Sequence, residues 1–197
     1  MKTKLILLSL VAMFLMATNT HAQYAVCLQA EEVTIPEGSD WKKSSTIAGY
    51  GGNGYLEWWG GDKFGAPKLE KNILVYTFTI PADGDYSVFV RGRRDWNKCG
   101  CPDSAASDAC NDIFVKIDND VWIKTLIKGK FGEWAWDLNF EKIHKKVEKS
   151  KFTLTAGKHT LYIAGRSAGV QFDAIKIGLY TQDRPTGVPD CKENKTN

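Results

Sequence analysis

This 197-residue sequence has few of the side chains on which nucleophilic catalysis depends. It contains three histidines, and His21 lies in an apolar N-terminal segment, which leaves His144 and His159. A serine or cysteine nucleophile needs a base within hydrogen-bond reach, and no G-x-S-x-G or comparable motif is present. These shortages argue against a hydrolase built on such a pair. The 23 acidic residues leave paired carboxylates for glycoside hydrolysis open as an alternative.

Long apolar runs are absent beyond the first residues of the chain. Residues 1–22 contain two lysines, an apolar run from Leu5 to Met16 and a small residue, Ala22, at the end. This order is typical of a secretory signal peptide cleaved after Ala22, and its apolar part is too short to cross a bilayer. The sequence therefore predicts a secreted or periplasmic protein without a membrane span.

Charge of one sign is also lacking once the signal peptide is set aside. Two of the 26 Lys and Arg residues lie in it, which leaves 24 basic residues against 23 acidic ones. A net charge near +1 gives no electrostatic reason to expect binding to nucleic acid or to an anionic membrane.

What the chain does have is a series of short stretches in which apolar and polar residues alternate. The stretch 151–179 predicts a strand, a turn at Gly157, a second strand and a third strand that carries Asp173. Turn residues separate most of the others. This pattern predicts an all-β fold, a two-sheet antiparallel sandwich or jelly roll, over residues 23–180, followed by a polar tail at 181–197. The other predicted strands are 25–34, 54–59, 74–80, 85–91, 112–117, 121–127 and 133–138.

One segment departs from this alternation. Residues 140–149 have helix-like apolar spacing at Phe140, Ile143 and Val147. The segment is short, so it is read either as a small helix or as an irregular surface turn.

Aromatic residues are plentiful, with seven Trp and seven Tyr, all after residue 22. A sugar ring presents an apolar face of C–H groups, so carbohydrate sites offer flat aromatic surfaces flanked by hydrogen-bonding groups. Adjacent strand residues point to opposite faces, so one of Trp58 and Trp59 should enter the core and the other should face outward, whereas Trp134 and Trp136 share a face. Core packing is the ordinary role of a tryptophan and the alternative for each of them.

Five cysteines in an exported chain predict disulfides with one thiol left over. Cys99, Cys101 and Cys110 lie in one predicted loop, and a Cys-x-Cys ring would be very tight, so Cys110 is expected to pair with Cys99 or Cys101. A zinc site is the competing interpretation, but neither remaining histidine stands at metal-ligand spacing from these cysteines.

The order of several loose motifs resembles carbohydrate-binding modules of families 6 and 35, which have a galactose-binding-like β-sandwich. The resemblance covers residues 26–179 and implies binding of a polysaccharide or glycan without its transformation. The motifs are VCLQAEEVTI, GYLEWW, YTFTIPADGDYSVFVRGRRDW, NDIFVKID, the Trp134-Ala-Trp136 segment and the closing strands within KFTLTAGKHTLYIAGRSAGVQFDAIKIGL.

In the resembled modules, loops at one end of the sandwich hold the ligand through two aromatics and an Asn before the last strand. The matching positions are Tyr55, Trp134 and Gln171, where Gln replaces the usual Asn and Trp136 is an alternative to Trp134. Trp58 and Arg94 complete the candidate set. Arg94 ends the cluster Arg91, Arg93 and Arg94, whose guanidinium groups would suit an acidic or sulfated glycan, or would form an ordinary solvated loop.

The same resemblance implies a structural calcium ion and a staple between the chain ends. Gln29, Glu31 and Asp173 match the ligand positions, with backbone carbonyls around residues 43–45 to complete the six to eight oxygens that calcium prefers. Ordinary edge carboxylates are the alternative. Because the first and last strands are neighbours in the resembled fold, Cys27 and Cys191 are expected to form a disulfide.

Together these observations predict a secreted, monomeric, non-catalytic carbohydrate-binding protein. Two other classes stay open: an extracellular structural or adhesion protein that binds another protein through the same sandwich, and a small polysaccharide-active enzyme.

Overall fold

The computed structural model describes residues 24–63, 65–95, 110–143 and 146–191. The predicted signal peptide, Cys99, Cys101 and His144 lie outside these ranges. Regular structure in the described ranges is strand, apart from two single-turn 3-10 helices, η1 (Ala30–Glu32) and η2 (Glu70–Asn72). The predicted all-β class is confirmed.

The strands form two antiparallel sheets. The seven-stranded sheet has the order β11-β5-β13-β3-β2, and β1 and β8 pair with β13 and β5 outside that path. Its strands are β1 (Val26–Gln29), β2 (Trp41–Ser44), β3 (Tyr55–Trp58), β5 (Gly84–Arg94), β8 (Ala135–Asp137), β11 (Phe152–Leu154) and β13 (Val170–Leu179).

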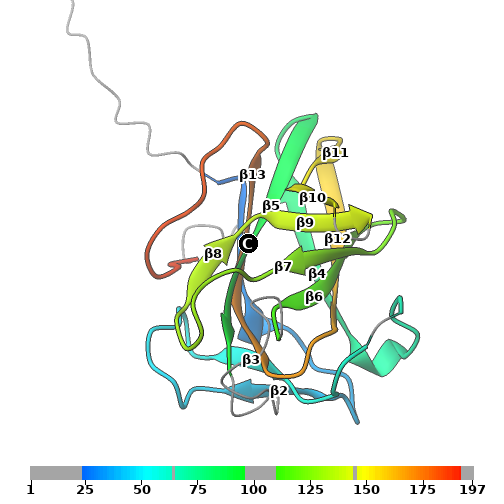
Figure 1. Ribbon diagram of the computed structural model, residues 1–197. Coiled ribbons are helices and arrows are strands. Elements are labelled where there is room, and N and C mark those ends of the chain that lie inside the picture. The colour runs from blue at the N-terminus through cyan, green and yellow to red at the C-terminus, as the bar shows by residue number, and fades with distance from the viewer. Residues whose placement is uncertain (1–23, 64, 96–109, 144–145, 192–197) are drawn as a thin grey trace, which may run out of the picture.

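The six-stranded sheet has the order β10-β9-β7-β6-β12-β4. In Figure 1 its strands β7 and β9 cross in front of β5 and β13 of the other sheet, as expected for a sandwich of two layers. Its strands are β4 (Ile73–Ile80), β6 (Asp112–Ile117), β7 (Ile123–Leu126), β9 (Asn139–Ile143), β10 (Lys146–Lys149) and β12 (Gly157–Gly165).

Alternation along the strands builds the core between the sheets. In β4 every second residue is buried, and the last three strands predicted from residues 151–179 are found as β11, β12 and β13. Leu56, Phe172 and Ile175 are fully buried members of the main core. Each strand that lines this core therefore presents its intervening residues on the outer face of its sheet.

Two sequence predictions about local structure are wrong. The described residues of the stretch 140–149 belong to β9 and β10, which pair as antiparallel strands, and not to a helix or an irregular turn. Phe140 is buried in the core whereas Val147 is 42% exposed, so these apolar residues do not share one helical face. The first predicted strand is shorter than 25–34, because β1 ends at Gln29 and η1 follows.

The segment after β13 packs against the seven-stranded sheet. Residues 180–191, the C-terminal segment, leave the end of β13 and return beside β8, coloured orange to red in Figure 1. Tyr24 Oη donates to the carbonyl of Asp183 (2.7 Å), and Trp136 Nε1 donates to that of Gly187 (3.1 Å). The segment ends in the predicted disulfide between Cys27 and Cys191, which is confirmed.

None of the helices in the described residues has the length and apolar character needed to cross a membrane.

Candidate functional site

The candidate site lies on the outer face of the seven-stranded sheet, near the ends of three neighbouring strands. Gln171 of β13 stands opposite Glu57 of β3 on one side and Arg93 of β5 on the other. Directly opposed residues of antiparallel strands share a face, so these three side chains form one row across the sheet. Leu56 and Phe172, their chain neighbours, point into the core.

Glu57 is the centre of the row. Its carboxylate is buried, and it accepts hydrogen bonds from Gln171 Nε2 (2.8 Å), Tyr55 Oη (3.2 Å) and Trp59 Nε1 (3.1 Å). A buried carboxylate needs such donors, because removing its charge from water is costly. The amide, phenol and indole groups are therefore held in place by one acceptor.

Arg93 continues the network on the other side of Gln171. Its Nη1 donates to Gln171 Oε1 (2.5 Å) and to Asp95 Oδ2 (3.1 Å), and its Nε donates to the carbonyl of Gly132 (2.8 Å). The Gln171 side chain thus joins a carboxylate to a guanidinium group, with its amide nitrogen toward Glu57 and its oxygen toward Arg93. The sequence assigned this amide to ligand binding, but Gln171 is fully buried, so it holds its neighbours in place and is not exposed to a ligand.

Trp58, the last residue of β3, and Trp59, which follows it, have opposite environments, as predicted. Trp58 is 2% exposed and packs against Trp41 in the core, with ring centroids 5.2 Å apart. Trp59 is 60% exposed, although its indole N–H is held by Glu57. Of the pair, Trp59 offers its ring to a ligand on this face, whereas the sequence had placed Trp58 in the candidate set.

The two aromatics matched to the resembled modules lie in contact. The rings of Tyr55 and Trp134 meet edge to face with centroids 5.1 Å apart, and Tyr50 packs on Tyr55 at 5.7 Å. Tyr55 is fully buried, while Trp134 is partly exposed and donates Nε1–H to the carbonyl of Ala48 (3.0 Å). Tyr55 therefore positions Glu57 and Trp134, and its ring is not exposed to a ligand.

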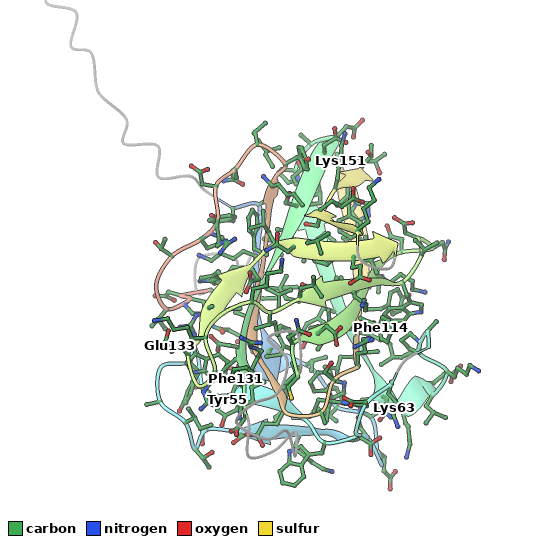
Figure 2. All side chains as sticks on the ribbon, in the orientation of Figure 1. Tyr55, Lys63, Phe114, Phe131, Glu133 and Lys151 are labelled. Atoms are coloured by element: carbon green, nitrogen blue, oxygen red, sulfur yellow. A yellow bond between two sulfur atoms is a disulfide. The ribbon has the colours of Figure 1, made fainter. Side chains whose placement is uncertain are left out.

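Figure 2 shows Tyr55 near Phe131 and Glu133 at one side of the lower end of the molecule, with Lys63 on the opposite side. The loop that carries Phe131 and Trp134 lies next to the row. Arg93 Nε of the row donates to the carbonyl of Gly132 in this loop.

The other two candidate ligand residues have structural surroundings. Trp136 is buried beneath the C-terminal segment, in a small cluster with Phe89 and Ala174. Arg94 is 5% exposed, donates to the carbonyl of Gly129 through Nε and Nη2, and stacks on the ring of Phe131 at 3.9 Å. Burial lowers the pKa of Arg94, and the charge of Asp137 opposes this shift.

The proposed calcium ligands Gln29 and Glu31 have oxygens that suit a cation. Gln29 Oε1 and Glu31 Oε2 are buried and have no hydrogen-bond partner in the part of the chain that the structure describes, which is costly for both groups. They are close together, because a Cβ built on Gly52 would lie 2.3 Å from Glu31 Oε1 and 3.0 Å from Gln29 Cδ. A hard cation that takes oxygen ligands would satisfy both of these atoms.

In the third proposed ligand, Asp173, both carboxylate oxygens already accept hydrogen bonds. Its Oδ1 accepts from the Gly51 N–H (3.0 Å) and its Oδ2 accepts from Arg91. Burial raises the pKa of Asp173 to about 6 against these hydrogen bonds, and the negative charge of Glu31 adds to the rise. Glu31 and Asp173 are therefore within electrostatic reach of each other, and a cation beside them would relieve their repulsion.

The zinc interpretation finds no support in the described part of the chain, where no three His, Cys, Asp or Glu side chains gather to hold a metal. Cys110 is disulfide-bonded, and both of its expected partners, Cys99 and Cys101, lie outside the described residues.

Comparison with known proteins gives similarity of structure only. No family model matches the chain, and no curated protein matches it. Among solved structures, the chain is similar to a GH26-CBM35 β-(1,4)-mannanase from Podospora anserina, with 13% identity and a TM-score of 0.51. That match covers 83% of this chain and 28% of the mannanase chain. The predicted resemblance to carbohydrate-binding modules is thereby confirmed as a similarity of fold.

Two isolated modules are also matched, at lower TM-scores. They are a family 35 carbohydrate binding module from Clostridium thermocellum (14% identity, TM-score 0.46) and the C-terminal CBM6 of a laminarinase from Zobellia galactanivorans (12%, 0.48). Each match covers 78% of this chain and at least 97% of the module's chain. By contrast, the chain spans 18% to 28% of the length of the first three solved structures.

Sequence reasoning missed Glu57, named Arg93 only as a member of a basic cluster, and placed Trp58 rather than Trp59 in the candidate set. A signal for two of these residues was available, because Tyr55, Glu57 and Trp59 alternate in the predicted strand and so share a face. Arg93 had no comparable signal, since only the pairing of β5 with β13 places it opposite Gln171.

Proposed function

We propose that this chain binds a polysaccharide or glycan on the exposed ring of Trp59, which is held in place by the row behind it, Glu57, Gln171 and Arg93. The observation that carries the proposal is the exposed indole of Trp59, whose N–H is fixed by the buried carboxylate of Glu57. A flat ring that is already oriented loses little conformational freedom when a sugar stacks on it.

Trp134 supplies a second partly exposed aromatic on the same face. It is linked to Trp59 through contacts that run from its ring to Tyr55 and from Tyr55 Oη to Glu57. The Arg91 guanidinium lies 5.5 Å from the Trp134 ring centroid, and Arg93 lies in the row itself. The Arg93 side chain is 13% exposed, whereas Glu57 and Gln171 are buried, so a guanidinium group beside the exposed aromatics is the donor that a sugar hydroxyl group could reach.

The proposal includes binding without catalysis, by a secreted monomer. In the described residues the only histidine is His159, which bonds to Asp118 and to the carbonyl of Thr155, so it does not serve as a base for a serine or cysteine there. The Cys27–Cys191 disulfide supports an oxidising, extracellular or periplasmic location.

A structural calcium ion is part of the same proposal. Gln29 and Glu31 would hold it through their unpartnered buried oxygens, with Asp173 as the adjacent carboxylate. The ion would supply positive charge to a buried acidic cluster and take no part in sugar chemistry.

Gel retardation in a panel of neutral and acidic polysaccharides tests the sugar site. Against the best polysaccharide, Trp59→Ala should weaken binding at least about tenfold, or 1.4 kcal/mol, because a stacking aromatic is lost. Trp134→Ala should weaken it as well. The matched control is Trp122→Ala, because Trp122 is partly exposed and packs with Tyr162 of the six-stranded sheet. Normal retardation of the Trp59 and Trp134 variants would refute the site.

A further inference from the structure

A second hollow lies on the other side of β3 from the proposed sugar site. It has a volume of about 430 Å³ and is formed between the loop after β3 and the end of β12. Its apolar lining comes from Trp58, Pro67, Leu69 and Ala164, among others. Its size is within the range of small-molecule sites, roughly 300 to 1,000 Å³. The two neighbouring tryptophans therefore lie at different sites. Trp59 is exposed on the outer face of the sheet, and Trp58 lines this hollow.

The Trp58 indole is a rigid part of the lining. A Cβ on Gly60 would lie 2.3 Å from Trp58 Cζ2, and one on Gly165 would lie 1.9 Å from Trp58 Cδ2, so only glycine fits at either position. The indole N–H donates to the carbonyl of Gly61 (2.8 Å). Close backbone approach from two sides and this hydrogen bond hold the ring in one orientation.

The loop that closes the hollow is tied to its neighbours. The Lys63 N–H donates to the Arg166 carbonyl (2.7 Å), and the Ala168 N–H donates to Asp62 Oδ1 (3.0 Å). At its other end the Asn72 N–H donates to the Leu69 carbonyl (3.0 Å). These hydrogen bonds hold the two ends of the loop beside the hollow, which lowers the conformational cost of binding.

Polar groups in the lining are few and mainly cationic. Asn72 is already engaged, since its Oδ1 accepts from the Asp40 N–H (2.9 Å) and its Nδ2 donates to Asp40 Oδ2 (2.9 Å). Lys63 and Lys68 also line the hollow, and neither ammonium group has a hydrogen bond or ion pair among the described residues. Two ammonium groups outnumber the single carboxylate of Asp62, so the lining is cationic overall.

These features differ from what a sugar requires. Sugar hydroxyl groups are both donors and acceptors, whereas ammonium groups only donate. An apolar lining with an excess of positive charge matches a ligand that has an apolar body and an anionic group.

We propose that this hollow binds a small organic anion with an apolar ring, of the aryl carboxylate class. The ring would lie against Trp58, Pro67 and Leu69, and the carboxylate would accept hydrogen bonds from Lys63 or Lys68. The site is separate from the proposed sugar site and does not depend on it.

The test uses cinnamate as the probe and follows amide and indole signals of the full chain by ¹H–¹⁵N NMR. Cinnamate should bind with a Kd on the order of 1 mM, as expected for a ligand of its size. Its addition should shift the signals of Trp58 Nε1, Leu69 and Gly165. The uncharged analogue cinnamamide should bind more weakly.

Three variants separate the parts of the proposal. The double variant Lys63→Ala/Lys68→Ala should weaken cinnamate about fivefold or more and leave cinnamamide unchanged, because only the anion loses its partners. Ala66→Trp, at an exposed position of the lining, should fill the hollow and abolish binding of both probes. Lys158→Ala, near the opposite end of β12 from Gly165, is the control and should change neither.

Some results would overturn the inference. Absence of any shift at concentrations on the order of 10 mM would show that the hollow takes no such ligand. Equal binding of cinnamate and cinnamamide would refute recognition of the anion, and shifts at Trp59 and Trp134 in place of Trp58 would refute the location. Trp59→Ala should leave cinnamate binding unchanged, so failure at one site can be distinguished from failure at the other.

Discussion

The outer face of the seven-stranded sheet is divided into a covered half and an open half. In the covered half Tyr24, Phe89, Trp136 and Ala174 form an apolar cluster beneath the C-terminal segment. In the open half the ring of Trp59 is exposed beside the row Glu57, Gln171 and Arg93, of which Glu57 and Gln171 are themselves buried. The strands β5 and β13 run through both halves.

The difference in exposure between Trp136 and Trp59 follows from the C-terminal segment, which covers Trp136 and not Trp59. Trp136 and Trp59 both donate an indole N–H, the first to the carbonyl of Gly187 and the second to the carboxylate of Glu57. One is 5% exposed and the other 60% exposed. The same residue type stabilises the fold in one half and is available to a ligand in the other.

The largest loss of stability is expected from removing the Cys27–Cys191 disulfide, which ends the C-terminal segment. The double variant Cys27→Ser/Cys191→Ser opens a loop with a sequence separation of 164 residues. By the chain-entropy model, the free energy of unfolding should fall by up to about 5 kcal/mol. Urea unfolding of the variant and the parent protein measures this, and a change below about 1 kcal/mol would mean that the segment holds without the bond.

Truncation of Trp136 tests the covered half directly. Trp136→Ala should lower the free energy of unfolding by about 3 to 5 kcal/mol, because it leaves a cavity under the C-terminal segment. Trp59→Ala should change stability by no more than about 0.5 kcal/mol, as expected at an exposed position. Chemical unfolding of both variants compares them. Similar losses of stability would show that the two halves do not differ as described.

The proposed calcium ion would lie beside the C-terminal segment, since its proposed ligand Gln29 also donates through Nε2 to the Pro189 carbonyl (3.5 Å). At a calcium concentration one hundred times its Kd, the free energy of unfolding should rise by about 2.7 kcal/mol through binding to the folded state alone. Melting curves with calcium and with chelator measure the rise. Glu31→Ala should remove it, and coincident curves for the parent protein would eliminate the site.

The smallest expected change in stability concerns His159. This residue lies in β12 of the six-stranded sheet, so its pH dependence is a control for the variants on the seven-stranded sheet. Burial lowers the pKa of His159, but hydrogen bonds with Asp118 (2.7 Å) and the Thr155 carbonyl (2.8 Å) outweigh it and raise the pKa. Stabilisation is therefore complete below the unfolded pKa of about 6.5 and is lost as pH rises through the higher folded pKa.

The Asp118 side chain is 43% exposed, so solvent screening keeps this contribution to about 1 kcal/mol or less. Urea unfolding at mildly acidic and mildly alkaline pH measures it, with Asp118→Asn as the comparison. The parent protein should lose more stability than Asp118→Asn on going to alkaline pH, while the Trp59 and Trp136 variants keep the parent's pH dependence. An equal pH dependence in the parent and Asp118→Asn would refute the role of the pair.

Much of the architecture could be predicted because strand alternation is a local signal. β4, β6 and β12 lie close to their predicted ranges, since every second side chain enters one core. The hairpin of β9 and β10 could not be predicted in this way, because its pairing depends on contacts with β7. β2 was missed because it has only four residues, of which only the first is buried.

Less of the candidate site than of the fold could be predicted from the sequence. Tyr55, Trp134 and Gln171 are brought together as expected, through Glu57 and the edge-to-face ring contact. The burial of Trp136 depends on where the C-terminal segment packs, and the sequence of that segment shows no apolar periodicity from which packing could be inferred. Tertiary placement, rather than residue type, separates the exposed aromatics from the buried ones.

The bond between Cys27 and Cys191 also has a mechanical consequence. Tension that reaches the chain before Cys27 and after Cys191 passes through the sulfur atoms and bypasses the chain between them, whose sequence separation is 164. β1 has only four residues and, among the described strands, pairs with β13 alone, so without the bond it would be the first strand to peel from the sheet. Under a pull on both ends, the sandwich would keep its length and the outer face of its seven-stranded sheet for as long as this covalent bond is intact.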